Sequence, residues 1–127
     1  MMEQAPLVWS ELAVNDMSRA VEFYQKHFGV SFRKEDMADM EMSILETKDP
    51  MAASVALVKH EMMKPSLEGS TVYLYLSESL NSLVDKLASA NVRILLPAMP
   101  IKDGEVGHIA IFEDCEGNKV GLWSPNA

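Results

Sequence analysis

The feature that most constrains the fold of this chain is an internal repeat with a period of about 62 residues. One strand pattern, one helix pattern and three short strand patterns occur in residues 5–62, and the same order returns in residues 67–127. Near the ends of the copies the offset grows to about 65 residues, where 49–57 matches 114–122. Residue identity between the copies is slight, so the order of apolar and polar positions is what defines the repeat.

The first copy opens with a half-buried strand at 7–14. A helix follows, with Asn15 or Asp16 as its N-cap and Gly29 as its stop, because its apolar residues recur at helical spacing. Alternation in the strand predicts two faces, one toward the helix with Val8, Leu12 and Val14, and one away from it with Trp9, Glu11 and Ala13. Three further strands are expected at 30–36, 40–47 and 54–60.

The second copy begins after a linker at 61–69, which contains Pro65 and Gly69. An alternating strand at 71–76 places Tyr73 and Tyr75 on one face. The remaining elements expected are a helix from Leu80 to Leu87 and strands at 92–96, 105–112 and 119–123, the last two joined by a tight turn at 114–118.

This pattern predicts an α+β fold of two βαβββ modules, residues 5–62 and 67–127, within a single domain spanning 1–127. A helix covers one face of each four-stranded module and leaves the other face bare. The two bare faces are expected to form one curved mixed sheet around a concave cup, which is the natural ligand site. The linker is long enough for the modules to pair within one chain or to be exchanged between chains.

The charge and the single cysteine narrow the possible partners and location. The net charge is −8, so nucleic acid and anionic membranes are not expected as partners. Cys115 is the only cysteine, which excludes an intrachain disulfide and suits a reducing compartment. The N-terminal stretch has neither a basic segment nor an uninterrupted apolar one, so a cytoplasmic location is expected.

The ten methionines have two interpretations. Met17 falls on a helix face, and Met40 and Met42 alternate in a strand, so they can be adaptable core fillers. The alternative is a soft ligand pocket lined by thioethers.

Two stretches resemble a known superfamily. The sequence VWSELAVNDMSRAVEFYQKHFGVSF at 8–32 and the closing stretch GHIAIFEDCEGNKVGLW at 107–123 are similar to the opening and the end of glyoxalase/bleomycin-resistance/dioxygenase (vicinal oxygen chelate) proteins. The family typically has proline where Cys115 stands. The resemblance implies the paired-module fold and small-molecule chemistry or binding in the cup.

The same resemblance implies four metal-ligand positions, on the first and fourth strands of each module. These positions hold Trp9, Ala56, Thr71 and Gly121 here, and none supplies a carboxylate or an imidazole. We therefore expect neither a metal nor another cofactor, although a shifted metal site stays open.

The candidate site combines aromatic side chains with one acid. If the cup is the face that carries Trp9 and Glu11, it also carries Tyr73, Tyr75 and Trp123. Burial there would suit Glu11 to act as a general base or to hold a ligand amine or hydroxyl. Alternatively, Glu11 is satisfied by neighbouring groups and serves only the fold.

The histidines and the cysteine contribute less to this site. His60 ends a strand and His108 opens one, so both are candidates for polar ligand contacts at the rim of the cup. His27 lies on the first helix and is expected to be solvated. Cys115 lies in a turn without a neighbouring base and is not expected to be a nucleophile.

Three functions remain open on the sequence. The first is a metal-independent module that binds a small apolar or aromatic molecule. The second is an enzyme with lyase, isomerase or dioxygenase-like chemistry, either metal-free with Glu11 as base or with an unrecognised metal site. The third is a structural domain whose cup is filled by side chains. A homodimer is expected in each case, since related proteins commonly pair.

Overall fold

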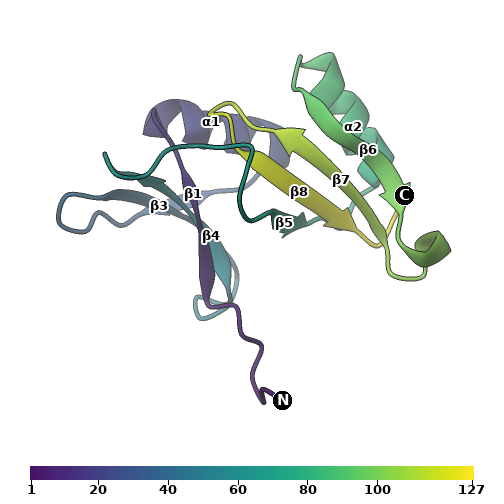
Figure 1. Cartoon of the computed structure of the whole chain (residues 1–127), viewed down its shortest axis with the longest axis horizontal. Coiled ribbons are helices and arrows are strands. Elements are labelled where there is room, and N and C mark those ends of the chain that lie inside the picture. The colour runs from purple at the N-terminus through teal and green to yellow at the C-terminus, as the bar shows by residue number, and fades with distance from the viewer. The chain divides into compact units, whose positions relative to one another are not determined.

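The computed structural model describes residues 1–127 and divides them into two compact units, Met1–Pro65 and Ser66–Ala127. Each unit contains one α-helix and one four-stranded mixed sheet (Figure 1). The predicted α+β class and the two βαβββ modules are therefore confirmed. Neither helix has the length and apolar character needed to cross a membrane.

The first unit follows the predicted order of elements. Its strands form a sheet in the order β1-β4-β3-β2, in which β1 and β4 are parallel and the other neighbours antiparallel. We call this the first sheet. The elements are β1 (Trp9–Ala13), α1 (Met17–Phe28), β2 (Phe32–Lys34), β3 (Glu41–Leu45) and β4 (Ser54–Lys59).

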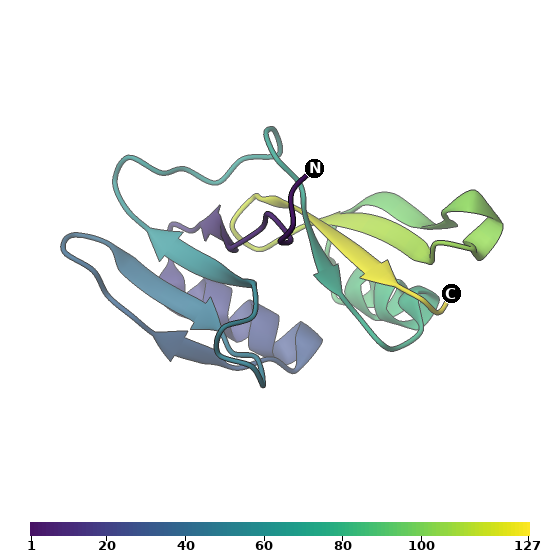
Figure 2. The ribbon, with the colours of Figure 1, turned by 90° about the horizontal axis from the view of Figure 1, so that it is seen from below.

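Helix α1 begins and ends where its capping residues predict. The Asp16 side chain accepts a hydrogen bond from the Arg19 backbone N at 3.0 Å, so Asp16 rather than Asn15 is the N-cap. Gly29 ends the helix with a φ of 64°, a left-handed conformation that glycine adopts without a Cβ penalty. The helix packs against β3 and β4, along one face of the first sheet (Figure 2).

Strand β1 starts later than expected, and one residue of the predicted helix-facing set, Val8, therefore does not face the helix. Leu12 and Val14 are buried as predicted, but Val8 precedes the strand and is 68% exposed. Placing Val8 toward the helix was wrong because the alternation argument holds only within the extended segment, and that segment begins at Trp9.

The second unit repeats the arrangement. Its sheet has the order β5-β8-β7-β6, in which β5 and β8 are parallel and the other neighbours antiparallel. We call it the second sheet. The elements are β5 (Val72–Tyr75), α2 (Leu80–Ser89), β6 (Ile94–Pro100), the short 3-10 helix η1 (Lys102–Gly104), β7 (His108–Glu113) and β8 (Lys119–Ser124).

Helix α2 is fixed by Ser79, whose hydroxyl accepts a hydrogen bond from the Ser82 backbone N at 3.3 Å. Leu80, Leu83 and Leu87 are buried along one side of the helix, which packs against β6, β7 and β8. The helix-packed side of the second sheet therefore carries the core of this unit.

Strand β6 is longer than the sequence predicts. It runs to Pro100 and includes Pro97, although proline donates no hydrogen bond to a sheet. β6 lies at the edge of the second sheet, where its free side needs no donor, and its pairing with β7 shifts register twice. Residues 101–107 form the turn that follows, so β7 begins at His108 instead of at residue 105.

Candidate functional site

A cavity of about 760 Å³ lies on the face of the first sheet opposite α1. We call this face the open face; its central residues are Ala56 on β4 and Ile44 on β3. The volume is in the range of pockets that hold drug-sized ligands. The lining residues are Val8, Trp9, Glu11, Arg33, Met37, Met40, Met42, Ile44, Leu45, Glu46, Thr47, Lys48, Pro50, Met51, Ala52, Ser54 and Ala56.

Four of these residues form a single cross-strand row. Glu11 on β1 pairs with Ala56 on β4, Ala56 pairs with Ile44 on β3, and Ile44 pairs with Arg33 on β2. Residues in register share a face of the sheet, so all four side chains project from the open face. This row, which we call the Glu11–Arg33 row, places a carboxylate at one edge of the sheet and a guanidinium cation at the other.

Trp9 and Glu11 lie together at the β1 edge. They are two residues apart in an extended strand and both line the cavity. The Trp9 indole Nε1 donates to Glu11 Oε2 at 3.3 Å, and the Trp9 side chain is 58% exposed. The general-base hypothesis for Glu11 assumed a buried carboxylate, whereas Glu11 is exposed within this unit. Its geometry suits contact with a ligand.

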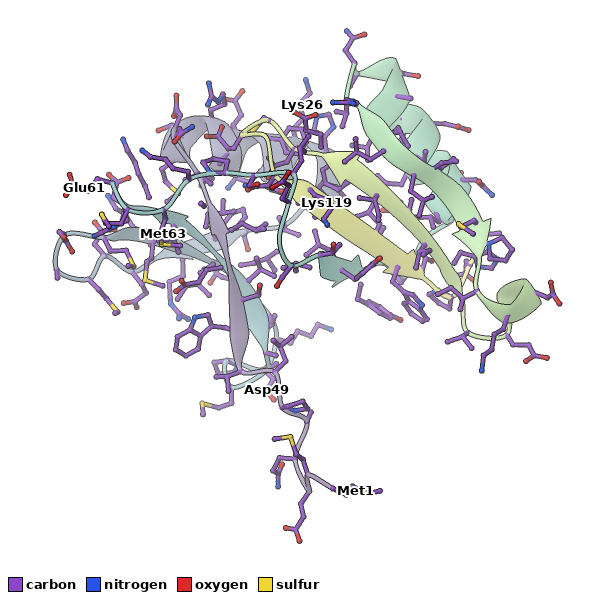
Figure 3. All side chains as sticks on the ribbon, viewed as in Figure 1. Met1, Lys26, Asp49, Glu61, Met63 and Lys119 are labelled. Atoms are coloured by element: carbon purple, nitrogen blue, oxygen red, sulfur yellow. The ribbon has the colours of Figure 1, made fainter.

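Methionines form much of the apolar wall. Met40 and Met63 pack against a buried cluster of Met42, Ala56 and Val58. Met37 and Met51 are exposed and line the cavity farther out. Figure 3 shows Met63 and Asp49 toward opposite ends of the β4 region, because one follows that strand and the other precedes it. Some methionines, such as Met42, thus belong to the core, and others, such as Met37 and Met51, form the outer wall of the cavity.

Charged groups border this apolar wall. Arg33 Nε contacts Glu35 Oε1 at 3.4 Å, and both side chains are about half exposed. Glu46 and Lys48 follow β3 in the loop and carry opposite charges. The cavity therefore has an apolar floor and a rim of both signs.

The second sheet carries an aromatic set on the face away from α2. The rings of Tyr75 and Trp123 are stacked, with centroids 5.6 Å apart and an interplanar angle of 30°. Tyr73 pairs with Gly121 in register, and a Cβ on Gly121 would collide with the Tyr73 ring. Trp123 Nε1 donates to the Val106 backbone O at 2.9 Å. Tyr73, Tyr75 and Trp123 therefore share one face, as their alternation predicts.

The structure thus forms two sets of predicted site residues, one in each unit. Trp9 and Glu11 line the cavity of the first unit, and Tyr73, Tyr75 and Trp123 lie on the second sheet. The hypothesis that all five line one shared cavity stays a prediction.

The two rim histidines lie apart from these sets. His60 follows β4 and is not among the residues lining the cavity; its Nδ1 accepts from the Met62 backbone N and its Nε2 contacts Asp39 Oδ2, both at 3.1 Å. Because Nδ1 accepts, Nε2 carries the proton and donates to Asp39. His108 pairs with the buried Ser124 and alternates with Ile109, which places it on the side of Ala110. That side is packed by α2, and His108 Nδ1 is buried without a partner.

The residues present do not fit the metal site that the fold family implies. Ala56 is buried without a donor atom, and the Tyr73 ring occupies the space into which a side chain at position 121 would project. Trp9 and Thr71 supply no strong ligand. No group of three or more His, Cys, Asp or Glu side chains is placed to hold a metal ion elsewhere in the chain.

A family model agrees with this architecture. The model of the Glyoxalase/Bleomycin resistance protein/Dioxygenase superfamily matches residues 7–122, which include both helices, the first sheet and all of the second sheet except the last two residues of β8. The chain belongs to this superfamily. A search of the curated proteins finds no match.

Three solved structures illustrate the similarity. UcmS2 is 19% identical, with a TM-score of 0.68 over 94% of this chain and 98% of that chain. TnmS3, an antibiotic binding protein from Streptomyces sp. CB03234, is 20% identical, with a TM-score of 0.69 over 99% and 100%. Glyoxalase I from Zea mays is 20% identical, with a TM-score of 0.70 over 92% of this chain and 43% of that chain. At these identities the likeness shows the fold alone.

Sequence reasoning missed the part of the cavity that comes from loops. Met37, Pro50, Met51 and Ala52 lie outside the strands but line the cavity. Alternation assigns faces only inside strands, so it says nothing of these residues. The abundance of methionine was the sequence feature that could have indicated this wall. Met40 and Met42 fit both interpretations of the methionines, because they belong to the core and also line the cavity.

Proposed function

We propose that the chain binds a small, largely apolar or aromatic molecule on the open face of the first sheet, without a resident divalent metal. The cavity of about 760 Å³ with its methionine and tryptophan wall carries the proposal. Adaptable thioethers and a flat indole suit an apolar or aromatic ligand. The fold likeness to an antibiotic binding protein supports the same class of function.

The aromatic set of the second sheet is proposed as a further contact for a flat ligand. Tyr75 and Trp123 are stacked, and Tyr75 is 70% exposed, so their rings are accessible within this unit.

A cavity-blocking variant tests the proposal. Ala52 is exposed and lines the cavity, whereas its exposed neighbour Ala53 does not. We expect Ala52→Trp to weaken the binding of the fluorescent probe 1-anilinonaphthalene-8-sulfonate at least several-fold, and Ala53→Trp to leave it unchanged. Both titrations are made with the full chain in the presence of EDTA. Equal effects of the two variants, or binding that requires an added metal, would contradict the proposed function.

A further inference from the structure

The Glu11–Arg33 row places a negative charge at one end of the cavity and a positive charge at the other. Its two charged members stand at opposite edges of the first sheet, because β1 and β2 are the edge strands. The row crosses three strand spacings, so the two backbones are about 14 Å apart. Between them lie only the apolar side chains of Ala56 and Ile44.

Both charged groups keep hydrogen-bonding capacity for a ligand. Glu11 uses Oε2 to accept from Trp9 Nε1, which leaves Oε1 for another donor. Arg33 contacts Glu35 through Nε, which leaves the two terminal amino groups of the guanidinium for an anion. The indole of Trp9 beside Glu11 adds a surface that favours a cation over its ring face.

We propose that the ligand of this cavity is an elongated zwitterion: an apolar or aromatic body with an ammonium group at the Glu11 edge and a carboxylate or similar anion at the Arg33 edge. This inference rests on the proposed function and adds to it the chemical class of the ligand. Glu46 and Lys48, the other charged lining residues, carry opposite charges in one loop and add no net charge to the rim.

Four probes with one shared body test the inference. They are 4′-(aminomethyl)biphenyl-4-carboxylate, which is the zwitterion, its methyl ester, its N-acetyl derivative and the N-acetyl methyl ester. The set presents both charges, only the cation, only the anion, and neither. Binding to the full chain is measured by isothermal titration calorimetry at low and high salt.

We expect each matched charge to strengthen binding about threefold at low salt, since both partners are exposed, and most of this gain to vanish in 1 M salt. The zwitterion should thus bind about tenfold more tightly than the neutral probe. Glu11→Gln should remove the advantage of the amine and leave that of the carboxylate. Arg33→Gln should do the reverse. The controls Glu22→Gln and Lys26→Gln alter exposed charges on α1 and should change nothing.

The outcomes separate the two proposals. If all four probes bind equally, or if Glu11→Gln and Arg33→Gln leave their order unchanged, the zwitterion assignment is overturned while the apolar binding function stands. If none of the four probes binds, the proposed function itself is contradicted.

Discussion

The ring of Tyr73 lies against Gly121, its register partner on β8, so closely that glycine is the only residue that fits position 121 without a shift. Because the φ of Gly121 is not in the left-handed region, space rather than backbone conformation excludes a side chain there. The packing of one aromatic ring therefore determines the residue at a position where the family implies a metal ligand.

A double-mutant cycle tests this packing. Gly121→Ala should destabilise the chain by about 1–3 kcal/mol, the usual cost of overpacking. Combining it with Tyr73→Ala should recover most of this loss, because the collision disappears. The matched control is Tyr75→Ala, which removes the next aromatic residue on the same face and should give no recovery. Urea midpoints of the variants supply the measurement, and additive effects of Gly121→Ala and Tyr73→Ala would rule the contact out.

Metal content is the second prediction. The residues at positions 9, 56, 71 and 121 offer no set of strong ligands, so the purified chain should hold no stoichiometric divalent ion. Elemental analysis before and after chelation makes the check. About one zinc, nickel, iron or manganese ion per chain, lost on chelation, would show that a different ligand set exists.

The third prediction concerns pH and stability. Partial burial, and then the neighbouring Lys26, lower the pKa of His27 below its usual 6.5. The unfolded chain therefore takes up this proton at a higher pH than the folded chain does, and stability is lost as the pH falls below about 6.5. His27→Gln should reduce the loss between pH 7.5 and pH 5.5 by a small amount, since the ring is partly exposed. Urea midpoints that fall equally in both proteins would contradict the assignment.

Self-association is the fourth prediction. Large apolar side chains outside the two sets of candidate site residues are exposed, among them Leu7, Met62 and Val106. We expect a homodimer, twice the mass of the 14.1 kDa chain, because apolar surface of this kind is commonly covered by a partner. Sedimentation velocity at micromolar concentration measures the mass. A single species at the monomer mass would count against this expectation.

The elements set by local chemistry were predictable from the sequence. The two ends of α1, at Asp16 and Gly29, could be predicted because capping depends on neighbouring residues alone. Alternation assigned Trp9, Glu11 and Tyr73 to the correct strand faces, since period-2 geometry is a property of any extended segment.

Features set by tertiary context were not predictable in the same way. The extension of β6 through Pro97 depends on its being an edge strand, which only the sheet order reveals. The Glu11–Arg33 row depends on three pairings between strands distant in sequence, and their register cannot be read from one strand pattern. The exposure of Glu11 likewise follows from its place on an edge strand facing an open cavity.

The parallel pairing of β1 with β4 has a consequence for synthesis on the ribosome. β1 is an edge strand whose sole neighbour is β4, so it cannot join its sheet until Lys59 has emerged. During translation of the preceding residues, Trp9 and Leu12 belong to an unpaired, partly apolar segment, which is the kind that aggregates or recruits chaperones. Translation pauses within β3 would prolong this exposure, and pauses after Lys59 would give the first sheet time to close.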